Sequence, residues 1–454
     1  MTNPASDLRG IERDAGNMKW SRHKPPGLND ILERHHSPHV IGGETVVLVD
    51  STSHQTLAKA IANSNAARSE LYVHIPFCPS RCLSCDHLAV IEHDRNAIDI
   101  YLETLAAELE LMAQASQSVT KIHRLHIGGG SPNYLDDIQL AKLMASIHSV
   151  FEITADAEVS MEINPRRTSR SQFELLQGLG IKNLQLEVRD VDSKVQSELG
   201  RTQSFSLLED VYGMAREMRF ESIAMDFLFG LPGQTSASVK DSVAMIAELG
   251  PDVLLCQQYT RRPHQFPHQA AIDENSMPSL AEKLAIFNSI VVGLENRGYD
   301  WVGLNAFVKP GHPLAQAQRD HTLEYNGLGY SSVKSDQTLG VGIGAVSEVG
   351  DVVAQSYVDI DAWKVAVEQG HLATQFLVET TEFELARKSV MRRLMCNTSV
   401  PISKVTQPKI AELVDSLESQ GYTEREGDLI CLTSLGRLAL PHFWSDSSPR
   451  YRWL

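Results

Sequence analysis

The sequence predicts an α/β protein built on an open, partial (β/α)6 barrel, and two observations lead to this prediction. Six short runs rich in β-forming residues recur between residues 71 and 259. Helical patterns with a period near 3.6 residues lie between them. This alternation is typical of parallel βα units, which bind ligands at the carboxyl ends of their strands. We therefore expect a functional site where these strands end.

The expected elements follow one another in a regular order. A first strand at 71–77 precedes a helix whose apolar positions run from Ile98 to Met112. The next helix is expected to begin after a cap at Asp136, because aspartate can accept the free N–H groups of a first turn. Thr235 ends a glycine-rich turn and is expected to cap a later helix. The remaining strands are expected at 123–127, 159–164, 183–188, 222–229 and 253–259.

Three regions differ in pattern. Residues 1–69 have weak periodicity and are expected to form an extended N-terminal arm. Residues 70–370 hold the barrel and an extension, and 371–454 predict a small winged-helix-like α+β module with helices near 383–396 and 410–417 and a hairpin turn at 426–428. A packing or lid role is favoured for this module over DNA binding, because no basic stripe accompanies it.

Composition narrows the class of protein. The 454 residues carry a net charge of −16, which disfavours nucleic acid or an anionic membrane as a partner. No apolar run approaches the ~18 residues that suggest a membrane span. The first 20 residues are polar, and the six cysteines do not form a disulfide framework. We expect a cytoplasmic protein in a reducing compartment.

A cysteine motif, CPSRCLSC at residues 78–85, follows the first expected strand. Its thiols are Cys78, Cys82 and Cys85, and three cysteines can hold three irons of a 4Fe–4S cluster. The fourth iron is then free to bind a cofactor. The spacing of these cysteines is that of radical S-adenosylmethionine (SAM) enzymes. A zinc site completed by His74 or His87 is the alternative. Structural zinc sites usually use two ligand pairs, and the sequence offers no second cysteine pair.

Polar residues occur where the later strands end. The segment HIGGGSP at 126–132 could bring backbone groups close to a ligand, although a Gly triplet alone is usually a turn. Glu162 and Asp226 are charged residues within apolar strands, which costs free energy unless they are paired. Either could serve a cationic cofactor, with a solvated strand end as the alternative. Candidate carboxylate binders are Arg189, Arg201, Arg261 and Arg262.

From about residue 70 onward the chain resembles the oxygen-independent coproporphyrinogen III oxidase family of the radical SAM superfamily. The resemblance lies in YVHIPFC at 72–78, GGGSP at 128–132, FGLPGQT at 229–235, AQAQR at 315–319 and LGVGIGAVS at 339–347. It implies a 4Fe–4S cluster that binds one SAM, with a second SAM beside the first. It further implies that an electron from the cluster cleaves SAM and that the resulting radical removes a hydrogen from a propionate β-carbon. Loss of carbon dioxide and one electron leaves a vinyl group, so two propionates of coproporphyrinogen III yield protoporphyrinogen IX in haem biosynthesis.

The resemblance also implies roles for particular residues. Glu162 and Asp226 are the expected catalytic residues. Residues matched to the first SAM are Tyr72, Gly129, Glu162 and Val346, and those matched to the second are Gly130, Ser131, Arg189, Arg201, Asp226 and Thr260. A tetrapyrrole substrate and a flavodoxin-like electron donor are implied as partners, and we expect a monomer.

The chain departs from the family pattern at several positions. Ser84 replaces the usual aromatic residue before the third cysteine, Asp86-His87 replaces Gly-Cys, and Arg189 stands where a glutamine is usual. Two alternative functions therefore stay open. One is a non-catalytic haem chaperone, which would bind haem and form no porphyrin product. The other is a radical SAM methyltransferase or haem-degrading enzyme, for which S-adenosylhomocysteine would be the mark.

Overall fold

The computed structural model describes residues 46–48, 53–116 and 120–438. Six parallel strands form the centre of its main sheet, each pairing with the next, as the sequence predicted. These strands are β2 (Ser69–Ile75), β5 (Lys121–Gly129), β6 (Glu152–Ile163), β7 (Asn183–Arg189), β8 (Ser222–Phe229) and β9 (Val253–Gln258).

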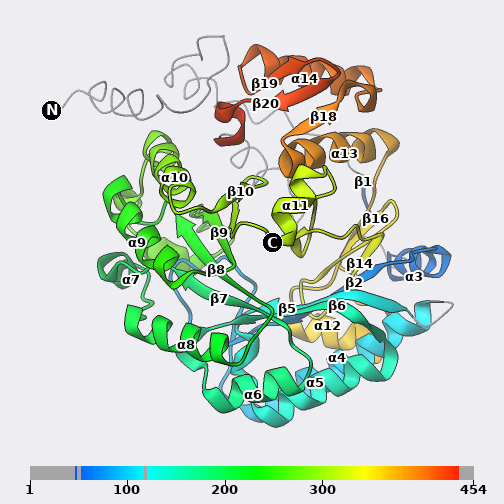
Figure 1. The fold of residues 1–454 in the computed structure, drawn as a ribbon. Helices are drawn as coiled ribbons and strands as arrows, with labels where there is room; N and C mark the ends of the chain where they lie inside the picture. Colours follow the sequence, from blue (N-terminus) through cyan, green and yellow to red (C-terminus); the bar gives the residue numbers. More distant parts are fainter. Residues whose placement is uncertain (1–45, 49–52, 117–119, 439–454) are drawn as a thin grey trace.

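Helices cover the outer face of this curved sheet (Figure 1). Asp136 caps α5 in a reciprocal capping box with Gln139, and Thr235 caps α9 in the same way with Ser238, so both predicted caps are confirmed. The covering helices are α4 (Arg95–Ala115), α5 (Asp137–Val150), α6 (Arg170–Gly178), α7 (Ser193–Glu198), α8 (Phe205–Glu217), α9 (Ser236–Leu249) and α10 (Leu280–Glu295).

The two faces of the parallel strands differ in polarity. Successive side chains of a strand point to opposite faces, and every second residue of these strands is apolar and buried beneath the helices. On β2 the buried residues are Leu71, Val73 and Ile75, whereas Tyr72 and His74 point to the interior of the partial barrel. The interior is therefore lined by polar side chains instead of being filled by a packed apolar core.

The sheet extends well beyond the six strands. Described residues form 13 strands in the order β1-β17-β16-β15-β14-β2-β5-β6-β7-β8-β9-β11-β10. β14 runs parallel to β2, while the outer strands at both ends are antiparallel. The added strands are β1 (Val46–Leu48), β10 (Asp300–Val302), β11 (Ala306–Val308), β14 (Gln337–Val341), β15 (Val346–Val349), β16 (Val352–Gln355) and β17 (Phe376–Glu379).

Segments at both ends of the chain join this sheet. The predicted arm supplies β1, which pairs with β17, and α3 (Ser53–Asn63), while residues 1–45 lie outside the described residues. The main sheet also continues past residue 370, because β17 belongs to it. The remaining elements of the extension are β12 (Glu324–Asn326), β13 (Gly329–Ser331), α11 (Pro313–Arg319) and α12 (Ile360–Glu368).

A C-terminal unit lies beside the opening between the two ends of the sheet (Figure 1). It has two helices near the predicted positions and a hairpin across residues 426–429, in a three-stranded sheet of order β18-β20-β19. Lys388 and Arg392 of its first helix pair with Glu348 of β15, and the helix shares an apolar cluster with residues of β10, β11 and α11. This unit therefore connects the two ends of the open sheet. Its elements are α13 (Glu382–Asn397), β18 (Ser399–Pro401), α14 (Pro408–Ser419), β19 (Thr423–Glu426) and β20 (Leu429–Leu432).

Within the described part of the chain, no helix combines the length and the apolar character that crossing a bilayer requires.

A buried carboxyl, Glu108 of α4, anchors the glycine-rich segment after β14. It accepts the N–H of Gly342 at 2.7 Å, and burial raises its pKa to about 7. The native state therefore holds a proton that the unfolded chain releases, so the stability linked to this group falls as the pH rises from about 4.5 towards 7.

Glu108→Gln keeps the acceptor and removes the charge. We expect it to raise the free energy of unfolding by on the order of 2 kcal/mol at about pH 8, and by little at about pH 5. Denaturant unfolding at both pH values measures this, with the exposed Glu110→Gln on the same helix as control. A Glu108 variant less stable than the parent at about pH 8 would contradict the expectation.

Candidate active site

The three motif cysteines lie in a loop fixed by backbone contacts. Cys78 ends β3 (Phe77–Cys78), and the loop returns at β4 (Val90–Ile91). The Cys85 N–H donates to the carbonyl of Cys82 at 3.2 Å, which closes a tight turn between the second and third thiols. The Leu83 N–H donates to the carbonyl of Leu199, and Arg81 donates to the carbonyl of Ala89. The spacing of the motif is thus built into a defined loop.

All three thiols line one cavity, which fits the predicted cluster. Burial raises the pKa of Cys78 to about 11 and that of Cys85 to about 12, so iron would have to displace their protons. No three His, Cys, Asp or Glu side chains among the described residues gather closely enough for a single metal ion. A zinc ion needs its ligands within about 2.3 Å, whereas a cluster spreads three thiolates over three of its four irons.

The glycine segment at the end of β5 packs directly against the end of β2. The N–H of Gly130 donates to the carbonyl of Ile75 at 2.8 Å, and that of Ser131 donates to Phe77 at 2.9 Å. Gly129 has φ +121° and donates its own N–H to Glu162. These three N–H groups, which the sequence suggested for ligand binding, are thus bonded within the protein. The glycines also allow two strand ends to approach closely.

Gly130→Ala tests this packing. A Cβ at this position would lie 2.3 Å from the carbonyl oxygen of Pro76, so we expect a loss of about 1–3 kcal/mol in stability and poorer iron loading. Gly178→Ala is the matched control, because a Cβ there meets no atom within 4 Å at the end of α6. Thermal unfolding and iron content are measured for both. Equal unfolding temperatures for the Gly130 variant and the parent would refute the close approach.

Glu162, on β6, presents a fixed negative charge to the interior. It accepts the Gly129 N–H at 3.0 Å and lies 3.4 Å from Nε2 of His126, whose Nδ1 contacts Ser160. Burial alone would raise its pKa, but His126, His87 and the Gly129 N–H together lower the pKa to about 2. The carboxylate is therefore ionised at every physiological pH and can hold a cationic ligand group.

A hydrogen-bond chain orients the tyrosine on β2. Nε2 of His74 lies 2.9 Å from the carbonyl of Leu88 and must donate to it, which leaves Nδ1 as an acceptor. The Tyr72 hydroxyl, 2.9 Å from Nδ1, then donates to the ring. Burial lowers the pKa of His74 to about 4, so the ring stays neutral. The Tyr72 side chain is thereby fixed at the wall of the interior cavity.

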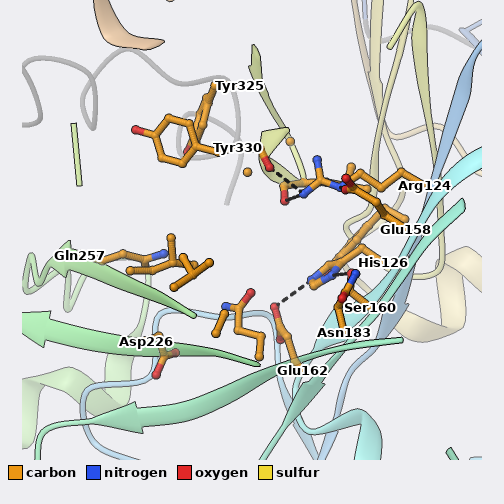
Figure 2. Close-up of a pocket in the computed structure, with 18 of the residues that line it drawn as sticks. Arg124, His126, Glu158, Ser160, Glu162, Asn183, Asp226, Gln257, Tyr325 and Tyr330 are labelled. Atoms are coloured by element: carbon orange, nitrogen blue, oxygen red, sulfur yellow. Dashed lines mark hydrogen bonds and ion pairs between the residues drawn. The ribbon is translucent and has the colours of Figure 1, made fainter. Parts of the chain in front are cut away.

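The interior of the partial barrel is a cavity of about 670 Å³ with many polar side chains in its wall, and it is large enough for a small-molecule ligand. Figure 2 shows Glu162, His126 and Arg124 on one side, Gln257 on the other, and Tyr325 and Tyr330 above them. Most of its charged groups are paired, as Arg124 is with Glu158. This interior cavity adjoins the cysteine cavity, and the residues that line both are Asp86, His87, Gly129, Glu187 and Arg189.

Four ionised side chains form a network at this boundary. Arg189 contacts Asp226 at 3.3 Å and Glu187 at 3.5 Å, and Arg201 contacts Glu187 at 3.3 Å. Burial alone would lower the pKa of Arg189, but Asp226 and Glu187 raise it above its usual value. Arg189 also has φ +70° at an irregularity in the pairing of β7 with β8, a costly conformation for a side chain of this size.

The structure places the predicted residues in two groups. Tyr72, Gly129, Glu162 and Val346, which were expected around the first SAM, all line the interior cavity. The set expected around the second SAM is divided. Asp226 lines the interior cavity, Arg189 lines both cavities, Thr260 lines neither, and the cysteine cavity alone holds Gly130, Ser131 and Arg201. Of the other candidate arginines, Arg261 pairs with Glu274.

Several residues of the site were missed in the sequence. His126, Ser160 and Glu158 all project inward from neighbouring positions on β5 and β6. Their signal is the period-2 alternation of polar residues with apolar ones within each strand. Glu187, on β7, carries the same signal and was also missed. Arg166 was missed because it belongs to a single turn after β6.

Three comparisons place this geometry among known proteins. The family model for the radical SAM superfamily, which describes its amino-acid sequences, matches residues 72–246. The oxygen-independent coproporphyrinogen III oxidase of Escherichia coli (strain K12) is 30% identical over 85% of this chain and 86% of its own length. That of Pseudomonas aeruginosa is 31% identical over 81% and 83%. The solved structure of coproporphyrinogen III oxidase (HemN) from Escherichia coli matches with a TM-score of 0.80 and 30% identity, over 87% of this chain and 93% of the other.

Proposed function

This chain belongs to the oxygen-independent coproporphyrinogen III oxidase family of radical SAM proteins, and we propose that it converts coproporphyrinogen III to protoporphyrinogen IX in haem biosynthesis. In this reaction two propionate side chains each lose carbon dioxide, a hydrogen atom and one electron to become vinyl groups. The observation that supports the proposal most directly is the pair of adjoining cavities, one lined by the three motif cysteines and the other polar and of ligand size.

The cluster and SAM, when bound, supply a carbon radical that removes a hydrogen atom from a substrate carbon. The three cysteines would hold the cluster, and Glu162 offers its fixed charge to the cationic part of SAM. Tyr72, held by its hydrogen bond to His74, lines the same cavity as Glu162. The role of the chain is therefore to bind and orient the reactants within an enclosed space.

The substrate carboxylates need cationic partners in a cavity rich in carboxylates. Arg189 lines the interior cavity where it adjoins the cysteine cavity, and Arg124 lines the interior cavity alone (Figure 2). Both guanidinium groups already have carboxylate partners that keep them charged and oriented. We infer that a propionate binds at Arg189 by sharing this guanidinium with Asp226.

The reaction also needs an external one-electron donor. The resemblance to the family points to a flavodoxin-like protein, and we propose that the chain acts as a monomer in the cytoplasm. The chain departs from the family pattern at Arg189 and at Asp86-His87. In addition, the residues expected around a second SAM do not line a single cavity.

An anaerobic assay tests the proposed function. Reconstituted protein is given SAM, dithionite and coproporphyrinogen III, and products are identified by chromatography and mass spectrometry. We expect 5′-deoxyadenosine together with mono- and divinyl products. Deoxyadenosine without a vinyl product would refute the substrate, S-adenosylhomocysteine would indicate a methyltransferase, and stable haem binding without any product would indicate a chaperone.

A further inference from the structure

Two arginines in the cysteine cavity direct their guanidinium groups at the same thiol. Arg201 is 5% exposed, and its Nη1 lies 3.7 Å from Sγ of Cys82. Arg166, in the single turn Pro165–Arg167 after β6, lines the same cavity and interacts electrostatically with Cys82. Both side chains line the cavity that would hold the cluster.

Separate contacts hold each arginine in place. Arg201 donates through Nη2 to the backbone carbonyl of Glu187 at 2.9 Å and to its carboxylate at 3.3 Å. Arg166 donates through Nε to Oδ1 of Asn164 at 3.3 Å. The amide of Asn164 also reaches Ser131, whose hydroxyl lies 3.4 Å from Sγ of Cys78. Donors are thus arranged at two of the three cysteines.

The pair of guanidinium groups has more positive charge than its surroundings neutralise. Arg166 is repelled by Arg201 and, among the described residues, has no carboxylate within ion-pair distance. Nε of Arg201 is buried and has no hydrogen-bond partner there either. Two adjacent cations with an unused donor are costly unless an anion lies between them. A 4Fe–4S cluster with three thiolate ligands is such an anion, and each added electron makes it more negative.

We propose that Arg166 and Arg201 act as a cationic clamp on the Cys82 corner of the cluster and raise its reduction potential. Positive charges and donors near the sulfurs stabilise the reduced cluster more than the oxidised one. The two arginines are thus positioning and tuning residues for the electron that begins the reaction. This inference depends on the cluster and not on the identity of the substrate.

The test is a redox titration of the reconstituted protein, followed by electron paramagnetic resonance (EPR) in the absence of SAM and substrate. Arg166→Gln and Arg201→Gln each remove one charge, and Arg167→Gln is the matched control, since Arg167 is exposed and lines neither cavity. We expect each of the first two variants to shift the reduction equilibrium up to tenfold towards the oxidised cluster. A tenfold shift corresponds to 59 mV for one electron. The control should match the parent.

Iron content and the absorption spectrum confirm that each variant carries a complete cluster before titration. If one glutamine variant does not retain the cluster, the other decides the question. A loaded Arg166 or Arg201 variant whose potential equals that of the Arg167 variant would overturn the proposal. Absence of porphyrin products would leave this titration unaffected, so the proposed function and this inference can fail independently.

Discussion

Cys82→Ala should abolish both cluster binding and SAM cleavage. A cluster held by three thiolates loses a third of its protein ligands with this change, and the Cys82 corner is also the one that Arg166 and Arg201 face. We expect bound iron to fall towards the level of unspecific binding and deoxyadenosine formation to fall to the protein-free background. Iron analysis, the absorption spectrum and product chromatography after anaerobic reconstitution measure these effects.

Cys431→Ala is the matched control for that experiment. Cys431 lies on β20 of the C-terminal unit and lines neither of the two cavities that form the site. This variant should bind a full cluster and form deoxyadenosine at the parental rate. A Cys82 variant that retains a complete cluster and the parental rate would show that the motif does not ligate the iron as described.

Glu162→Gln should weaken SAM binding strongly while leaving the cluster in place. Glutamine keeps the size of the side chain and can still accept the Gly129 N–H, but it removes the charge. Charge-assisted hydrogen bonds contribute about 1.5–3 kcal/mol, so we expect the dissociation constant for SAM to rise about 10- to 100-fold. Equilibrium dialysis of the reconstituted protein with labelled SAM measures the affinity directly.

The control for this change is Glu152→Gln on the same strand, where the side chain is exposed and pairs with Lys121 outside the cavities. The native pKa of Glu162, about 2, lies below the ordinary value of 4.5. Any stability linked to this group is therefore present above about pH 4.5 and lost as the pH falls towards 2. Parental affinity for SAM should thus show no titration of this carboxyl near neutral pH. Unchanged affinity in the Glu162 variant would contradict its role.

Much of the fold could be predicted from the sequence because periodicity reports burial directly. The six parallel strands were found this way, whereas the caps at Asp136 and Thr235 were found from the hydrogen-bonding capacity of their side chains. The outer antiparallel strands were not predicted, since segments of three or four residues such as β10 and β15 carry too little pattern. Pairings such as β1 with β17, more than 300 residues apart, have no local signal.

The sequence predicted those residues of the site that carry a local signal, but not the contacts that join distant segments. The cysteines stood out by their spacing at residues 78–85, and Glu162 stood out as a charged residue within an apolar strand. Which residues share a cavity depends on how distant segments pack together, and no local pattern indicates that Arg201 faces Cys82 or that Thr260 lies apart. The network of Glu187, Arg189 and Asp226 likewise joins two strands, β7 and β8, so neither strand alone indicates it.

The central claim is that three cysteines hold a cluster with one iron open to SAM, and one measurement tests it most directly. EPR spectra of the reduced, reconstituted protein are recorded before and after one equivalent of SAM is added. The account predicts a 4Fe–4S signal that changes on addition of SAM in the parent, changes far less in the Glu162→Gln variant at the same SAM concentration, and is absent in Cys82→Ala. A spectrum that SAM leaves unchanged in the parent, with a full complement of iron, would contradict it.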